Sequence, residues 1–192
     1  MTEGPPRVFT LDGPEPLAIS VRLEAPGDEP GVRDGHRAAF PGPEEADIVD
    51  RIRREAPGGW YSIVATLPGD GPIVGHLLLT PCPVVDEDGV RRGEVLAIGP
   101  VAVLPEVQYR GVGSSLMAAA QGVAVSRGVP ALVLLGHPSY YPRFGFEPAR
   151  AVGLLPPAEA WPDDAWMARL LPAWTDELHG TVRYPAAFEP LA

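Results

Sequence analysis

The first half of the chain switches between strand-like and helix-like hydrophobic patterns. Three segments have apolar residues that alternate with polar ones or form a short unbroken run, which predicts β-strands over 17–24, 60–67 and 72–81. The sequence "PGDG" between the last two predicts a hairpin. Segments 32–40 and 42–58 predict helices, and the second begins with acids and ends with arginines, as the helix dipole favours.

The second half contains a long strand followed by a helix and shorter elements. Segment 94–105, "EVLAIGPVAVLP", has no charge between its first residue and Glu106, so we expect a central strand that is covered on both faces. Segment 111–128 predicts a helix that ends at its last glycine. The remaining segments predict, in order, a buried strand (131–135), a turn (137–144), a strand (145–154), a short helix (162–174) and an edge strand (180–188).

This order of elements predicts the α/β class, with a mixed sheet flanked by helices. We expect a single domain over residues 17–192, because no internal repeat or long linker divides it. Residues 1–16 are acidic and rich in proline without a basic or apolar start, so we expect a loose leader and no signal peptide.

Composition and charge exclude several classes of function. No apolar run approaches the roughly 18 residues needed to span a bilayer, so we expect no membrane partner. The net charge of −10 argues against nucleic acid as a partner, since a phosphate backbone demands a basic surface. Cys82 is the only cysteine, which excludes an intrachain disulfide and is typical of the cytoplasm. All 15 basic residues are arginine, so a Schiff-base lysine is also excluded.

The charge is unevenly distributed. No Asp or Glu lies between Val107 and Phe146, yet the stretch keeps Arg110, Arg127 and Arg143. Burial of this region explains most of the gap, because core segments carry few charges of either sign. The retained arginines favour an anionic ligand.

The segment "QYRGVGSS" (108–115) joins the long strand to the helix. It is either a tight turn or a cradle for phosphate oxygens, because a helix N-terminus presents free N–H groups and glycines let a ligand approach the backbone. A dinucleotide fingerprint does not fit. Its third glycine is replaced by Leu116, and no acid follows at the required distance.

The strand before this loop is interrupted at Gly99-Pro100, and a proline cannot donate to a sheet ladder. Such a break is typical of a bulge or of strands that separate. The backbone of Val101, Ala102 and Val103 would then be free to pair with an extended, amide-containing ligand. An open strand followed by a phosphate cradle indicates coenzyme A.

Two motifs resemble those of the GNAT acetyltransferase superfamily. "QYRGVG" (108–113) is similar to its Q/R-x-x-G-x-G/A pattern, and "YYPRFGF" (140–146) is similar to its Y-x-x-x-G-F element. The resemblance implies the GNAT-like fold, with a mostly antiparallel sheet splayed after its fourth strand. It implies an enzyme that transfers an acetyl group from acetyl-CoA to an amine acceptor in a ternary complex.

The resemblance also implies the site. The residues expected to bind the cofactor are Val101, Ala102, Val103, Gln108, Tyr109, Arg110, Gly111, Val112, Gly113, Ser114 and Ser115. Tyr141 corresponds to the tyrosine that protonates the departing thiolate. A phenol has a pKa of about 10 and keeps its proton at neutral pH. Tyr140 is better explained as aromatic packing beneath the glycine loop.

The remaining candidates are less defined by the sequence. Glu94 is the first choice for the base that deprotonates the amine and His76 the second, although either also fits a solvated strand end or a core residue. The tryptophans at 161, 166 and 174 either pack a short helix or wall an acceptor pocket. Segment 180–188 is a candidate homodimer interface. No metal is expected, since no ligand cluster has suitable spacing. A non-catalytic acyl-CoA-binding module is the alternative function.

Overall fold

The computed structural model describes residues 14–55 and 59–191. The helices are α1 (Glu29–Ala39), α2 (Glu44–Glu55) and α3 (Val112–Ser126), with short 3₁₀ helices η1 (Pro105–Val107), η2 (Tyr141–Phe144), η3 (Ala149–Val152) and η4 (Ala186–Leu191). The strands are β1 (Ser20–Leu23), β2 (Tyr61–Thr66), β3 (Ile73–Val85), β4 (Arg91–Val103), β5 (Ala131–Leu135), β6 (Glu147–Pro148), β7 (Leu154–Leu155), β8 (Trp166–Leu170) and β9 (Gly180–Val182). Within these residues, no helix is long and apolar enough to cross a bilayer.

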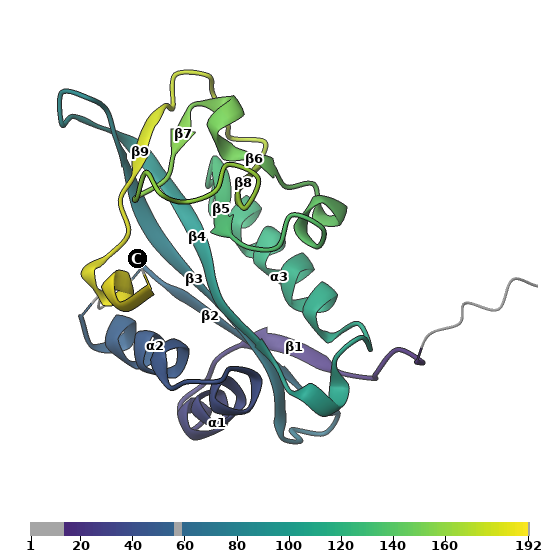
Figure 1. The fold of residues 1–192 in the computed structure, drawn as a ribbon. Coiled ribbons are helices and arrows are strands. Elements are labelled where there is room, and N and C mark those ends of the chain that lie inside the picture. Colours follow the sequence, from purple (N-terminus) through teal and green to yellow (C-terminus); the bar gives the residue numbers. More distant parts are fainter. Residues whose placement is uncertain (1–13, 56–58, 192) are drawn as a thin grey trace, which may run out of the picture.

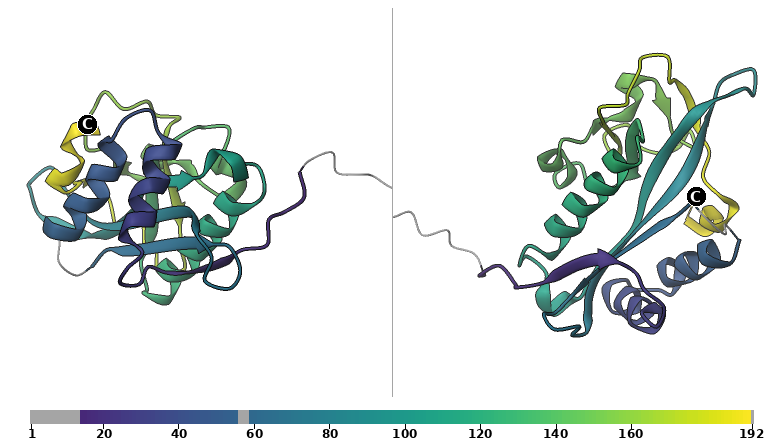
Figure 2. Two further views of the ribbon diagram at one scale, coloured as in Figure 1. Left: turned by 90° about the horizontal axis from the view of Figure 1, so that it is seen from below. Right: turned by 180° about the vertical axis from the view of Figure 1, so that it is seen from behind.

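One mixed sheet forms the centre of the molecule, as the sequence predicted (Figure 1). Its order is β1-β2-β3-β4-β5-β8-β6, and β9 joins β3 to β7. The pairs along this order are antiparallel except β4–β5, and β7–β9 is also parallel. Helices α1 and α2 cover one face and α3 covers the other, which the rear view in Figure 2 shows clearly.

Apolar burial explains how the helices attach. One face of α3 places Val112, Leu116 and Ala120 in a cluster with side chains from β2 to β5. On the opposite face, α1 and α2 pack against β2 and β3 through a second cluster that includes Ile48, Ile52 and Leu78. Because both faces of the central strands are covered, β3 and β4 are apolar along most of their length.

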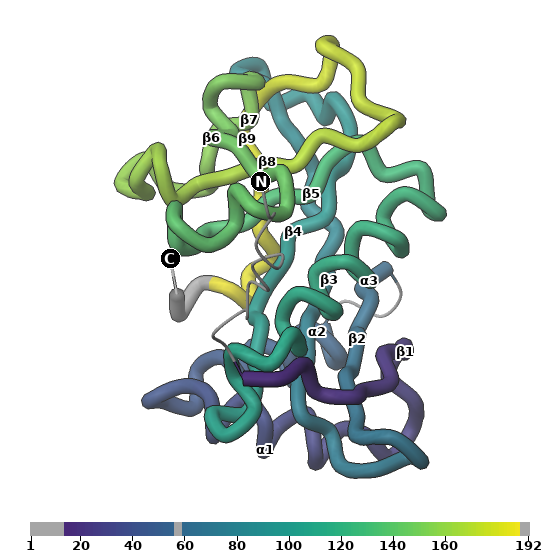
Figure 3. The backbone as a smooth tube through the Cα atoms, turned by 90° about the vertical axis from the view of Figure 1, so that its right-hand side faces the viewer, coloured from purple at the N-terminus to yellow at the C-terminus, as the bar shows by residue number. Residues whose placement is uncertain are grey.

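Strands β4 and β5 separate at the Gly99-Pro100 break. The parallel register between them contains only Leu96↔Leu132 and Ala97↔Val133. Opposite the break, the register with β3 slips from Leu79↔Ile98 to Leu77↔Val101, so β4 holds one extra residue there. Figure 3 shows β5 and β8 in one half of the molecule and β1 and β2 in the other, with β4 between. The predicted splay after the fourth strand is confirmed.

Three predictions of local structure were wrong. Segment 162–174 contains strand β8 instead of a helix, because Trp166–Leu170 pairs with β5 on one side and β6 on the other. Segment 145–154 contains only short strands around η3. Segment 180–188 is not an edge strand, since β9 pairs with both β3 and β7 and the chain then turns into η4.

The described part of the predicted leader begins at residue 14, and residues 1–13 lie outside the described residues. Where it can be followed, the chain is held at the start of α3. The Leu17 N–H donates to the carbonyl of Arg110 (2.9 Å), and Arg110 Nε donates to the carbonyl of Glu15 (3.2 Å).

Candidate active site

The loop between β4 and α3 is shaped by two residues with positive φ. Tyr109 has φ 63° and Gly111 has φ 87°, and Gly111 forms the N-terminal cap of α3. Val112 then places its side chain in the core, where it is 1% exposed. This buried valine fixes the first turn of α3, so the next residues, Gly113 and Ser114, line a cavity.

The first turn of α3 leaves backbone donors for a ligand. The N–H groups of residues 112–114 have no partner within the helix, as for the start of any α-helix. The positive end of the helix dipole adds to their attraction for an anion. The Ser115 N–H does not belong to this set, because it donates to the Gly111 carbonyl at 3.0 Å.

The three side chains before Gly111 have different environments. Gln108 Nε2 donates to the carbonyl of Val103 (3.1 Å), and Gln108 lines the cavity. Tyr109 also lines it and is 91% exposed. Arg110 extends its guanidinium to the carbonyl of Glu15, so its charge is directed to the N-terminal segment.

The separated edge of β4 presents backbone groups to the cleft. The Leu104 N–H donates to Val74 of β3 (3.0 Å), whereas the Val103 carbonyl accepts from Gln108 and therefore points away from β3. Backbone groups alternate in direction along an antiparallel strand, so the N–H and carbonyl of Val101 also point toward the open edge. Ala102, opposite His76, has its groups directed to β3.

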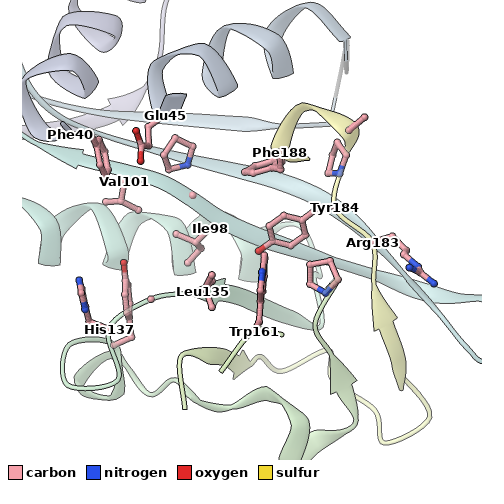
Figure 4. Close-up of a pocket in the computed structure, with 17 residues that line it drawn as sticks. Phe40, Glu45, Ile98, Val101, Leu135, His137, Trp161, Arg183, Tyr184 and Phe188 are labelled. Atoms are coloured by element: carbon pink, nitrogen blue, oxygen red, sulfur yellow. The ribbon is translucent and has the colours of Figure 1, made fainter. Parts of the chain in front are cut away.

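Two cavities meet beside this edge. The helix cavity, of about 650 Å³, includes the start of α3, Gln108 and Tyr140. The C-terminal cavity, of about 690 Å³, lies between residues 98–101 of β4, the end of β5 and the C-terminal segment (Figure 4). The two cavities share four of their lining residues, which are Phe40, Val101, His137 and Tyr141. A molecule in the helix cavity can therefore meet a second molecule at this junction.

The two adjacent tyrosines have different positions. Tyr140 lies against the glycine loop, where its hydroxyl oxygen would be 2.8 Å from a β-carbon on Gly113. Tyr141 lies at the junction, and its ring packs on Gly136 and on Phe146 (6.0 Å between centroids). Burial raises the pKa of Tyr141 to about 12, with a smaller contribution from Tyr140. The Tyr141 hydroxyl is therefore a proton donor at neutral pH.

The arginines of the acid-free stretch are not equivalent. Arg143 lines the helix cavity, with its guanidinium carbon 3.8 Å from the centre of the Tyr140 ring. Arg127 lies over the ring of Tyr61 instead, at 5.1 Å. Arg143 is thus the arginine of this stretch that can face an anion bound at the loop.

Neither sequence candidate for the base lies at the junction. Glu94 belongs to the part of β4 before the splay, where its half-exposed carboxylate pairs with Arg91 (2.6 Å). His76 is buried under α1, with Nδ1 2.8 Å from His36 Nε2 and Nε2 2.6 Å from the Ser62 hydroxyl. Neither residue lines the helix cavity or the C-terminal cavity.

Three residues at or beside the junction were not expected from the sequence. Phe40 and Glu45 come from the end of α1 and the start of α2, and His137 follows β5. Phe40 and Glu45 reach β4 only because α1 and α2 fold over the splay, and no local sequence pattern indicates this contact. Trp161 lines the C-terminal cavity, whereas Trp166 is fully buried and donates to Leu154 (2.9 Å), so the tryptophans both wall a pocket and pack the core.

The site contains neither a metal cluster nor a reactive thiol. No group of three or more potential metal ligands occurs among residues 14–55 and 59–191. Cys82 is fully buried in the core, and burial raises the pKa of its thiol. The polar side chains that line both cavities are those of Tyr141 and His137.

Comparisons with known proteins agree with this arrangement. A family model described as "Acetyltransferase (GNAT) domain" matches residues 20–149. The Escherichia coli K12 protein named uncharacterized N-acetyltransferase YjhQ is 32% identical over 160 residues, which cover 81% of this chain and 86% of that protein. Escherichia coli YhbS, named an uncharacterized N-acetyltransferase, is 33% identical over 131 residues, covering 66% of this chain and 72% of that protein.

Solved structures share the fold along most of the chain. A crystal structure of Escherichia coli YhbS in complex with CoA has a TM-score of 0.79 and 27% identity, covering 90% of this chain and 93% of that one. A GNAT family acetyltransferase from Brucella melitensis in complex with acetyl-CoA has a TM-score of 0.70 and 28% identity, covering 89% and 98%.

Proposed function

Because this chain belongs to the GNAT acetyltransferase family, we propose that it transfers the acetyl group of acetyl-CoA directly to an amine. One observation carries the proposal: the helix cavity and the C-terminal cavity meet at Phe40, Val101, His137 and Tyr141. In this account the helix cavity binds acetyl-CoA, the C-terminal cavity binds the amine, and the acetyl group lies at the junction.

The helix cavity suits the parts of acetyl-CoA. The free N–H groups at the start of α3 and the guanidinium of Arg143 would bind the pyrophosphate. The outward-facing N–H and carbonyl of Val101 and the N–H of Val103 would pair with the amides of the pantetheine arm, as an added strand does. Related proteins have been solved with CoA and with acetyl-CoA, which supports this assignment.

The transfer step follows from the groups at the junction. The amine nitrogen attacks the thioester carbonyl, a C–N bond forms, and the C–S bond then breaks. Tyr141 donates its proton to the departing thiolate, since its phenol is protonated at neutral pH. The N–H of Val101 faces the same edge and would stabilise the oxyanion that develops on the carbonyl. The proton lost by the amine goes to solvent, directly or through His137, which is exposed and lines both cavities, and Tyr141 regains a proton from solvent.

Direct transfer is favoured over an acyl-enzyme. A covalent route needs an accessible nucleophile, and the only cysteine of the chain is buried with a raised thiol pKa. Cys82 also lines neither cavity.

The test is release of free CoA thiol from acetyl-CoA in the presence of a panel of primary amines. Amine-dependent thiol release with formation of the N-acetyl product supports the proposal. Binding of acetyl-CoA without turnover of any amine would contradict it and favour a non-catalytic acyl-CoA-binding module. Detection of the acetylated amine by mass spectrometry distinguishes acetyl transfer from hydrolysis of the thioester.

A further inference from the structure

Aromatic and aliphatic side chains form most of the lining of the C-terminal cavity. Aromatic rings from distant parts of the chain line it, and three of them form a connected wall, which we call the aromatic wall: Trp161, Tyr184 and Phe188. The ring centroids of Trp161 and Tyr184 are 5.6 Å apart, and those of Tyr184 and Phe188 are 5.0 Å apart. Burial raises the pKa of Tyr184 well above its usual value, so its hydroxyl is neutral. Such a wall favours an aromatic or extended apolar ligand.

One acidic residue lines this cavity. Glu45 lies in the first turn of α2, and it takes part in no ion pair within the part of the chain that the structure describes. Figure 4 shows its carboxylate beside Phe40, at the end of the cavity where Val101 and His137 also lie. This end is the junction with the helix cavity. A carboxylate next to an aromatic face is a site for an ammonium group, through charge-assisted hydrogen bonds and cation–π attraction.

The opposite end has the opposite charge. Arg183 lines the cavity beyond Tyr184 and lies at the far side from Glu45 in Figure 4. A second positive charge at the distal end of an acceptor would approach this guanidinium unfavourably. We therefore expect diamines and polyamines, and acceptors whose nucleophilic end is anionic, to be disfavoured.

We propose that Glu45 binds the ammonium group of the acceptor at the junction, and that the acceptor is a primary amine carried on an aromatic body which packs on the aromatic wall. This inference rests on the proposed function and names the substrate class of the same site. Glu45 holds the ammonium group at the junction, where it loses a proton to solvent, directly or through His137, before its nitrogen attacks the acetyl group. The wall fixes the length and direction of the remainder. The residue contributes to acceptor recognition and leaves the binding of acetyl-CoA unaffected.

The test compares two neighbouring glutamates in the first turn of α2. Glu44 is exposed and does not line the cavity, so Glu44→Gln loses the same interaction with the helix dipole without changing the site. With 2-phenylethylamine as acceptor, Glu45→Gln should raise KM by about tenfold or more, and Glu44→Gln should leave it within about twofold. Acetyl-CoA affinity, measured by calorimetry without acceptor, should be unchanged in both variants.

Two further comparisons test the acceptor class. Trp161→Leu should raise KM for 2-phenylethylamine more than for butylamine, because only the aromatic acceptor uses the wall. Spermidine should be a poorer acceptor than 2-phenylethylamine. Equal kinetics for Glu45→Gln and Glu44→Gln, preference for spermidine, or failure of 2-phenylethylamine to bind or react with the acetyl-CoA-loaded protein would each overturn the inference. Failure of acetyl-CoA itself to bind is a separate result, which would overturn the proposed function and this inference with it.

Discussion

The hydroxyl of Tyr140 lies so close to Gly113 that a β-carbon on this glycine would be 2.8 Å from the phenolic oxygen. The position of the Tyr140 ring therefore requires a residue without a side chain at Gly113, although about 27 residues separate the two. This contact gives a reason for Gly113 that does not depend on φ. A methyl group at Gly113 would force the Tyr140 ring to shift, and both residues line the helix cavity.

Gly113→Ala should weaken acetyl-CoA binding by about tenfold while the fold remains stable, because alanine has the higher helix propensity. Tyr140→Phe removes the hydroxyl that the methyl group meets. Combining Gly113→Ala with Tyr140→Phe should therefore restore most of the affinity, so that the two effects are not additive. Calorimetric titration of the single and double variants with acetyl-CoA checks this. Wild-type affinity in Gly113→Ala would contradict the assigned role of the contact.

The arginine that lines the helix cavity should bind an anion. Arg143→Gln should lower acetyl-CoA affinity by about fivefold at low salt, with a smaller loss at about 0.5 M salt, since an exposed charge is screened. Arg127→Gln is the matched control, because Arg127 belongs to the same acid-free stretch but lies over Tyr61. Equal effects of the two substitutions would show that Arg143 acts only through the general charge of the protein.

Tyr141 should matter for turnover and not for affinity. Tyr141→Phe should lower kcat by roughly 10² or more with an unchanged Kd for acetyl-CoA, whereas Tyr140→Phe should retain turnover. Burial raises the pKa of Tyr141 to about 12, so its phenol stays protonated up to pH 10. The kcat of the wild type should therefore not decline between about pH 9 and 10 through loss of this proton. Unaltered kcat in Tyr141→Phe would remove the residue from the mechanism.

The buried histidine pair under α1 should make stability depend on pH. Desolvation lowers the pKa of His36 from 6.5 to about 4 and lowers that of His76 well below 6.5, so both are neutral in the fold. The unfolded chain binds these protons below about pH 6.5 and the folded chain does not, so stability falls as the pH decreases toward 4. Between about pH 7 and 5 we expect the free energy of unfolding to fall by on the order of 2 kcal/mol for His36 alone.

Urea unfolding at both pH values measures this change, in a range above the pKa of most carboxylates. A variant with His36→Phe and His76→Leu should show a smaller difference between the two conditions. An unfolding free energy of the wild type that is constant from about pH 7 to 5 would contradict the assignment of a neutral pair.

The sequence predicted those parts of the fold that local pattern determines. The long strands, the three helices and the Gly99-Pro100 break were predicted because their apolar periodicity and their glycine and proline positions are local signals. Strand β8 was missed because "AWMARLL" has apolar residues at spacings that also fit a helix, and its pairing with β5 and β6 is decided by tertiary contacts.

The site was predictable on one side only. Gly113, Ser114 and Tyr141 were identified from continuous motifs, and the structure places all three along the helix cavity. Phe40, Glu45 and His137 had no such signal, because they meet only when α1, α2 and the segment after β5 converge on β4. Glu94 is a candidate by sequence because it begins the central strand, but the splay that opens the site begins beyond it, after Ala97.

The most direct test of this account is a calorimetric titration of the purified protein with acetyl-CoA, beside NAD as a control nucleotide that shares the pyrophosphate but lacks the pantetheine arm. We predict saturable binding at one site for acetyl-CoA and no comparable binding of NAD, because the open edge of β4 recognises the amide arm. Absence of acetyl-CoA binding, or equal binding of the two nucleotides, would contradict it and leave residues 108–115 as a turn between a strand and a helix.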